Sequence, residues 1–297
     1  SEQDSDAGSD EKPVHSVTLS DYYIGETEVT QELWEAVMGT NPSYFRGSQK
    51  PVEQVSWNDC KEFITKLNEL TGKNFRLPTE AEWVYVASQN WKPEAGWHNL
   101  NSDFKLHPIC SSFVDEQDIC DMAGNAMEWV YDLWVPFHKV DVDDYAGGRT
   151  NEGIEERVLK GGSFNNSPAS MHLYSRGDVY MVTSSSKANY VGFRLAFGAI
   201  PNPSYMDMRG NEVSVDYALM VKSKTVRNFV ERPLSKLVFR DDVRGTLAYV
   251  DFNEAVVSVT ELNTGVSAYH PDISPDGKYV AFCTGLEGVS GNSKVYV

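Results

Sequence analysis

Two acidic side chains in one short stretch could hold a hard metal ion. The stretch CDMAGNAMEWVYDLW, from Cys120 to Trp134, places Asp121 and Glu128 on either side of Gly124. Gly124 permits a sharp turn, which can direct neighbouring carbonyl oxygens toward the two carboxylates. Calcium takes about six to eight such oxygens, so the pattern is compatible with a calcium site. A salt bridge at Glu128 and an ordinary turn at Gly124 are the alternative interpretation.

A second stretch, KGGSFNNSPASMHLYSRGD, begins with a Gly-Gly-Ser turn of the kind that brings backbone close to a ligand. Polar side chains after such a turn are well placed to line a pocket. The candidate pocket residues are Ser163, Asn165, Asn166, Met171, His172, Tyr174 and Arg176. The alternative is that Ser163 and Arg176 only satisfy buried backbone groups.

The cysteines and histidines give no support for zinc. The four cysteines form no C-x-x-C pair, and the six histidines show no close ligand spacing. Cys60 lies within a helical pattern and is expected to pack in the core. Cys110 and Cys120 could form a local disulfide in an oxidising compartment, or they could remain free buried thiols.

The charge distribution excludes some partners. The formal net charge is -17, and residues 1–200 hold 31 acidic and 16 basic side chains. Such a field repels phosphate backbones and attracts cations, so we expect no nucleic-acid partner, while metal ions fit. A solvated acidic surface would explain most of these charges equally well. No run of about 18 apolar residues occurs, so we expect no membrane insertion by this segment.

The elements that must position these residues indicate an α+β fold. Helices are expected to start at the caps Thr30, Ser56 and Thr79, each followed by apolar residues at helical spacing. Strand patterns precede Thr30 and return in RVLKGGSF and YVGFRLAFG. Between them, residues 89–151 are rich in Trp, Asn, Asp, Gly and Pro, which predicts long ordered loops rather than helix or sheet.

The end of the chain has a different pattern. Residues 235–297 form short alternating segments with frequent turns, which predicts a small all-β module. Its HPDISPDGKYVAFCTG stretch resembles the TolB-type β-propeller repeat, in which an SPDG turn joins two strands. A propeller needs about four blades to close, so we expect a partial repeat within a longer chain. The expected domains are 14–200 and 235–297, with 201–234 as a linker or connecting strand.

Several blocks, in order, resemble one enzyme family. EVTQELWEAVM, PVEQVSWNDCKEFITKLNELTGKNFRLPTEAEWVYVAS, CDMAGNAMEWVYDLW, RVLKGGSF and VGFRLA are similar to the formylglycine-generating enzyme, or sulfatase-modifying factor, family over about residues 14–198. The resemblance implies a C-type-lectin-like fold with long ordered loops. It also implies a calcium site made of the Asp121 and Glu128 side chains and the Gly124 and Ala126 carbonyls. Asn99 and Leu100 would be remnants of a second calcium site.

The same resemblance implies that the catalytic groups are missing. In formylglycine-generating members, two cysteine thiolates after the Gly-Gly-Ser turn hold Cu(I), a soft ion that prefers sulfur. Asn166 and Met171 stand at those two positions, so we expect no copper. No His-rich helical bundle of the iron-dependent members is present either.

Together these patterns predict a pseudoenzyme. We expect a non-catalytic, calcium-stabilised binding or scaffold module of a larger bacterial envelope or surface protein, in an extracytoplasmic setting, with a peptide or a carbohydrate as ligand. An enzyme of altered chemistry that uses the polar residues of the cleft is the alternative. A third hypothesis is a structural envelope component in which side chains fill the pocket.

Overall fold

The chain divides into two compact units, Ser1–Asp216 and Tyr217–Val297. The computed structural model describes residues 8–112, 118–149, 155–177, 182–201, 203–213, 236–241, 246–251, 259–266, 268–284 and 294–297. Within these ranges, none of the helices has the length and apolar character needed to cross a membrane.

Three α-helices of the first unit begin at hydroxyl side chains, as predicted. They are α1 (Gln31–Met38), α2 (Trp57–Thr71) and α3 (Glu80–Ser88). In each, the capping hydroxyl of Thr30, Ser56 or Thr79 accepts a hydrogen bond from the backbone N–H three residues later, which satisfies one of the free donors of the first turn. Short 3-10 turns occur at Ser9–Glu11, Pro93–Ala95 and Pro168–Ser170.

An eight-stranded sheet forms the centre of the first unit, with the strand order β10-β9-β6-β4-β8-β2. Two further strands branch from it, because β3 also pairs with β8 and β7 also pairs with β4. The β4–β8 and β6–β9 pairs are parallel, and the other pairs are antiparallel. A separate parallel pair joins β1 to β5. The strands are β1 (Val17–Thr18), β2 (Tyr23–Glu28), β3 (Phe75–Arg76), β4 (Met127–Leu133), β5 (Val142–Asp143), β6 (Tyr145–Gly148), β7 (Arg157–Lys160), β8 (Val191–Phe197), β9 (Ser204–Met206) and β10 (Glu212–Val213).

The prediction of loops throughout residues 89–151 is wrong for β4, β5 and β6. β4 is a central strand of the sheet, and six of its seven residues are buried. A strand covered on both faces has no solvent side, so its sequence lacks the alternation that marks a half-exposed strand. Glu128 and Asp132 also argued against a buried strand, because charged residues are rarely buried.

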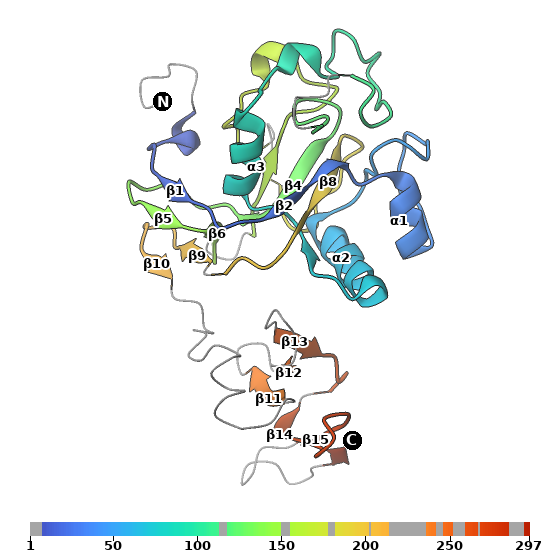
Figure 1. Cartoon of the computed structure of the whole chain (residues 1–297), viewed down its shortest axis with the longest axis vertical. Helices are drawn as coiled ribbons and strands as arrows, with labels where there is room; N and C mark the ends of the chain where they lie inside the picture. The colour runs from blue at the N-terminus through green and yellow to red at the C-terminus, as the bar shows by residue number, and fades with distance from the viewer. Residues whose placement is uncertain are drawn as a thin grey trace. The chain divides into compact units, whose positions relative to one another are not determined.

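Helices cover both faces of this central strand, and successive β4 side chains point to opposite sides. Trp129 packs in a core cluster with Trp34 of α1 and Phe63 of α2. Val130 packs instead with Trp83 of α3. Figure 1 shows α1 and α2 on one side of β2, β4 and β8, with α3 on the other. The functional groups of β4 that face α3 are therefore enclosed between the sheet and that helix.

The second unit is all-β in its described residues, which confirms the predicted class of this module. It contains two three-stranded antiparallel sheets, β11-β12-β13 and β14-β15-β16. The strands are β11 (Lys236–Asp241), β12 (Thr246–Asp251), β13 (Val259–Leu262), β14 (Tyr269–Ile273), β15 (Val280–Cys283) and β16 (Val295–Tyr296).

The SPDG turn and the segment predicted to connect the two domains remain to be placed. The SPDG turn joins β14 to β15, where the Gly277 N–H donates to the Ser274 carbonyl at 2.8 Å. Of the connecting segment predicted over 201–234, the described residues 203–213 contain β9 and β10, which extend the sheet of the first unit. Residues 214–234 lie outside the described residues.

Candidate functional site

Glu128 is buried on β4 and is held by an arginine from the neighbouring strand. Its Oε2 atom accepts hydrogen bonds from Arg194 Nε at 2.7 Å and from Trp83 Nε1 at 2.8 Å. Its Oε1 atom accepts from Arg194 Nη2 at 2.6 Å. Both partners of this ion pair are fully buried, so the pair is protected from solvent screening. The salt bridge considered as the alternative for Glu128 is therefore present.

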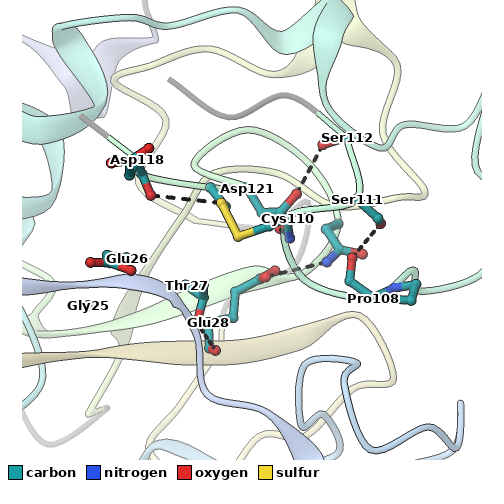
Figure 2. Close-up of a disulfide and its surroundings, with 12 residues drawn as sticks. Gly25, Glu26, Thr27, Glu28, Pro108, Cys110, Ser111, Ser112, Asp118 and Asp121 are labelled. Carbon is teal, nitrogen blue, oxygen red and sulfur yellow. Dashed lines mark hydrogen bonds between the residues drawn. A yellow bond between two sulfur atoms is a disulfide. The ribbon is translucent and has the colours of Figure 1, made fainter. Parts of the chain in front are cut away.

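Asp121 lies beside a disulfide that fixes the loop before it. Cys110 and Cys120 are joined, which settles the two possibilities that the sequence left open. Asp121 Oδ2 accepts from the Cys110 N–H at 2.7 Å, and Oδ1 accepts from the Ser112 hydroxyl at 3.0 Å. Figure 2 shows Asp121 next to the sulfur pair, with the carboxylate directed at Ser112. Burial raises the pKa of Asp121 above its usual range.

A third carboxylate, which the sequence analysis did not single out, belongs to the same cluster. Glu28 at the end of β2 is buried, and its Oε1 atom accepts from the Ala126 N–H at 3.2 Å. Burial, together with the nearby charges of Asp121 and Glu128, raises the pKa of Glu28 well above its usual range. Glu28, Asp121 and Glu128 thus face a single buried guanidinium, that of Arg194.

The turn that carries the predicted carbonyl ligands can contain only glycine at its tightest point. Gly124 has φ +83°, and a Cβ there would lie 2.2 Å from the Trp97 carbonyl oxygen. The Gly124 N–H donates to the Gly161 carbonyl at 3.0 Å, which ties this turn to the Gly-Gly-Ser loop. Within the described ranges, no three His, Cys, Asp or Glu side chains form a group that could hold a metal. The predicted ligand set, in contrast, has two acidic side chains and two carbonyls.

Asn99 and Leu100, the predicted remnants of a second calcium site, contact other residues than those of this cluster. The Asn99 N–H donates to the Asn166 carbonyl at 3.0 Å, so Asn99 contacts the loop after Gly162. Leu100 is exposed, with its N–H directed at His98 Nδ1 at 3.2 Å. The Asn99 Oδ1 atom is buried and forms no hydrogen bond with the described residues, so the second calcium site stays a prediction.

A cleft of about 250 Å³ opens beside the Gly-Gly-Ser turn. Gly161, Gly162, Asn166, Met171 and His172 are among the residues that line it. Both glycines have positive φ, of +93° and +70°. Met171 is buried against Gly162, so a methionine thioether covers one side of the cleft.

The candidate pocket residues separate into lining and supporting groups. Asn166 turns its Oδ1 atom back to the Ser163 N–H and hydroxyl, both at 2.9 Å, so Ser163 is buried as a support of the turn. Asn165 is exposed. Tyr174 is 45% exposed and lines a different cavity.

Arg176 does not line the cleft but belongs to a buried charge network under α3. Its Nε atom donates to both carboxylate oxygens of Glu80 at 3.0 Å, and Nη1 donates to the Val135 carbonyl at 2.8 Å. Lys160 Nζ also approaches Glu80 Oε1, at 3.4 Å. Asp132 Oδ2 accepts from the Glu80 N–H at 2.7 Å.

Burial shifts the pKa of two members of this network. It raises the pKa of Asp132 well above its usual range, and the charge of Glu80 acts in the same direction. Burial lowers the pKa of Lys160, while the neighbouring Glu80 carboxylate opposes that effect. Glu80, Asp132 and Lys160 were not predicted to be members of one site. Each lies inside a quoted block, but only the fold brings the blocks together.

Comparisons with known proteins agree with this architecture. A family model described as the sulfatase-modifying factor enzyme 1-like domain matches residues 1–199. The chaperone protein LppX of Paenibacillus barcinonensis is 32% identical over 179 residues, which cover 39% of this chain and 64% of LppX. The formylglycine-generating enzyme of Mus musculus is 30% identical over 193 residues, which cover 57% of this chain and 50% of the enzyme.

A solved structure shows the same fold. Treponema denticola variable protein 1 is 30% identical, with a TM-score of 0.57, over 62% of this chain and 86% of that protein. The chain thus spans between half and about two thirds of the length of the two curated relatives named above.

Proposed function

The chain belongs to the sulfatase-modifying factor enzyme 1-like domain family, and from that premise we propose that it is a non-catalytic, calcium-stabilised binding or scaffold module. The observation that carries the proposal is the pair Asn166 and Met171 in the cleft. Asparagine offers a hard oxygen and methionine a neutral thioether, and neither replaces a thiolate as a ligand for Cu(I).

The remaining cysteines support the same conclusion, because each has another place in the chain. Cys60 is fully buried on α2, where it packs with Phe63 and Trp34. Cys110 and Cys120 form a disulfide with each other, and Cys283 belongs to the second unit. Burial also raises the pKa of Cys60 well above its usual range, so this thiol is unsuited to metal binding or nucleophilic attack.

Calcium would be held by the Asp121 and Glu128 side chains with the Gly124 and Ala126 carbonyls. An ionised carboxylate has about four acceptor positions. The structure uses three on Glu128 and two on Asp121, so both retain acceptor capacity. The charges of Asp121 and Glu128 contribute to the raised pKa of Glu28, which indicates a negative potential in this cluster that a bound dication would reduce.

The cleft beside Gly161 is the place where we expect a ligand such as a peptide or a carbohydrate. Its lining combines polar groups of Asn166, Ser170, His172 and Ser175 with the apolar Met171 and Leu159 side chains. A mixed lining of this kind suits recognition through hydrogen bonds and apolar contact. The relative LppX is named a chaperone protein, a description that also concerns binding rather than oxidation.

An extracytoplasmic envelope setting accounts for the disulfide, since structural disulfides persist in oxidising compartments. We further propose that the second unit is a partial β-propeller of a longer protein. Its two three-stranded antiparallel sheets and the SPDG turn between β14 and β15 support that assignment.

A second candidate function is an enzyme of altered chemistry in the same cleft. The observation in its favour is Lys160, which lines the cleft beside Gly161 and whose pKa is lowered by burial. A lysine of this kind can act as a base or a nucleophile. Against it, the Glu80 carboxylate lies 3.4 Å from Lys160 Nζ and stabilises the charged form.

The proposal is tested by calcium titration in a calorimeter, with wild-type protein and two aspartate variants. We expect about one calcium per chain in the wild type and at least tenfold weaker binding in Asp121→Ala, because a charged ligand is lost. Asp103→Ala serves as the control, since Asp103 is exposed and pairs with Lys105 at the surface. Folded wild-type protein that takes up no calcium, or Asp121→Ala with wild-type affinity, contradicts the calcium assignment.

A further inference from the structure

A second cavity lies on the other side of Lys160, under the N-terminal segment and α3. Its volume is about 460 Å³, within the usual range of small-molecule sites. Val14 from the N-terminal segment, Ala81 and Val84 from α3, and Phe137 form much of its apolar wall. This cavity is larger than the cleft beside Gly161 and is lined mainly by apolar atoms.

Hydrogen-bond donors are concentrated at one place in this apolar wall. Lys160 and Tyr145 line the cavity, and both side chains are buried. The Lys160 ammonium has three donors, but the contact with Glu80 Oε1 is long, at 3.4 Å. The Tyr145 hydroxyl and Arg176 Nη2 are also buried and interact with each other, but neither has a hydrogen bond of normal geometry with the described residues.

These donors exceed the acceptors beside them. The Glu80 carboxylate is already engaged by Arg176 Nε through both of its oxygens. Asp132, the other carboxylate of the network, accepts a hydrogen bond from the Glu80 N–H and does not line the cavity. Burial raises the pKa of Asp132 and so favours its neutral form, which leaves Glu80 as the carboxylate in direct contact with Lys160 and Arg176, while Glu11 lies at the cavity wall.

A buried donor without an acceptor is unfavourable, so a ligand that supplies an oxygen here is favoured. We propose that this cavity binds a small, mostly apolar molecule that carries one anionic oxygen group, with the oxygens at Lys160 and Tyr145 and the apolar body against Ala81, Val84 and Phe137. The site goes beyond the proposed function, because it uses neither the calcium cluster nor the Asn166 and Met171 positions.

Glu11 at the cavity wall limits the charge of such a ligand. Glu11 and Glu80 both line the cavity, and Glu80 already neutralises part of the positive charge. A second anionic group on the ligand would lie near these carboxylates and be repelled. One anionic group on an apolar body therefore fits better than a polyanion such as a nucleotide.

Two fluorescent probes with the same aromatic body test the assignment. 8-Anilinonaphthalene-1-sulfonate carries one anionic group, and N-phenyl-1-naphthylamine lacks it. We expect saturable binding of one sulfonate probe per wild-type chain, with at least tenfold higher affinity than the neutral probe. Ala81→Phe places a ring in the cavity and should weaken both probes at least tenfold, whereas Lys160→Met should remove the preference for the sulfonate.

Controls separate cavity binding from unfolding. Lys66→Met removes an exposed lysine that pairs with Glu62 on α2 and does not line the cavity, so it should bind both probes as the wild type does. Near-ultraviolet circular dichroism and cooperative thermal unfolding show whether each variant is folded. Should Lys160→Met fail to fold, Tyr145→Phe removes only the hydroxyl and should reduce the preference at least threefold.

Three results would overturn the proposal: absence of saturable probe binding to the wild type, folded Ala81→Phe with wild-type affinities, or an unchanged sulfonate preference in the folded Lys160 or Tyr145 variant. None of these measurements involves calcium or copper. A result that overturns the cavity proposal can therefore be distinguished from a result that overturns the proposed function.

Discussion

Met171 lies directly against Gly162. A Cβ built on Gly162 would be 2.5 Å from Met171 Cγ and 2.7 Å from its Sδ atom. The close contact is possible because Gly162 has no side chain and has φ +70°. Met171 therefore fills space at one of the two positions where formylglycine-generating relatives are expected to carry a thiol, and the local backbone is adapted to that methionine.

Replacing Gly162 with alanine should destabilise the first unit by roughly 2–4 kcal/mol, because a positive φ is strained for alanine and Met171 must move. The free energy of unfolding, measured by urea denaturation, tests this. Gly177→Ala is the matched control, since no atom lies within 4 Å of a Cβ built there and its φ is not positive. Equal stability of both variants would show that the contact with Met171 is loose.

Restoring two thiols should create a copper site that the native chain lacks. We expect Asn166→Cys/Met171→Cys to bind about one Cu(I), at least a hundredfold more tightly than the wild type, because thiolates are the ligands that Cu(I) prefers. Competition with a chromophoric Cu(I) chelator without oxygen measures the affinity. Asn166→Ser/Met171→Ser is the control, with similar volume and no sulfur. Wild-type protein that competes as well as the double cysteine variant contradicts the prediction.

The Cys110–Cys120 disulfide should stabilise both the fold and the calcium cluster. It closes a loop of ten residues, so Cys110→Ser/Cys120→Ser should lose about 2–3 kcal/mol of stability. Calcium should also bind more weakly, because the Cys110 N–H positions Asp121 Oδ2. Denaturation with and without a phosphine reductant provides the control: the reductant should lower the wild type to the level of the variant and leave the variant unchanged. A reductant effect of equal size on both would exclude the disulfide as its cause.

Glu53 should make stability depend on pH in a defined direction. Glu53 is buried. Its Oε1 atom accepts a hydrogen bond from the Phe45 N–H at 2.7 Å, its Oε2 atom has no hydrogen-bond partner among the described residues, and burial raises its pKa to about 7. The unfolded chain releases this proton near pH 4.3, whereas the folded chain retains it until about pH 7. Between these values the folded state binds more protons than the unfolded state. The contribution of Glu53 to the free energy of unfolding therefore decreases as pH rises through this range, and it is constant above about pH 7.

Glu53→Gln is therefore expected to be more stable than the wild type at pH 8 by roughly 1–3 kcal/mol, with the difference disappearing near pH 4.5. Urea midpoints at several pH values measure it. Glu62→Gln, at an exposed position of α2, should show no comparable change. A difference between Glu53→Gln and the wild type that is independent of pH would contradict the assigned titration.

The sequence predicted the helices well because their signals are local. Thr30, Ser56 and Thr79 cap the helices by bonding to residues three positions away, and Gly39 and Gly72 end two of them in the left-handed conformation. The central strand β4 was missed because its burial comes from α3 on one face and from α1 and α2 on the other. That enclosure depends on contacts between distant segments and leaves no periodic pattern.

The sequence predicted some residues of the candidate site but not others. The Asp121 and Glu128 spacing identified the two carboxylates, but Glu28 joins them only because β2 and β4 both flank β8. Arg176 was expected beside a cleft and instead pairs with Glu80, 96 positions away in the chain. A buried ion pair between such distant positions cannot be derived from local pattern, because either residue alone is typical of an exposed surface.

Metal content and thiol oxidation, measured together on the same purified chain, test the central claim most directly. After exposure to excess calcium and Cu(I) and removal of loosely bound ions, we predict about one calcium and no stoichiometric copper per chain. We also predict no conversion of a cysteine-containing peptide to its aldehyde. Stoichiometric copper together with turnover of that peptide would contradict the account, since it would show oxidative chemistry without a thiol at positions 166 and 171.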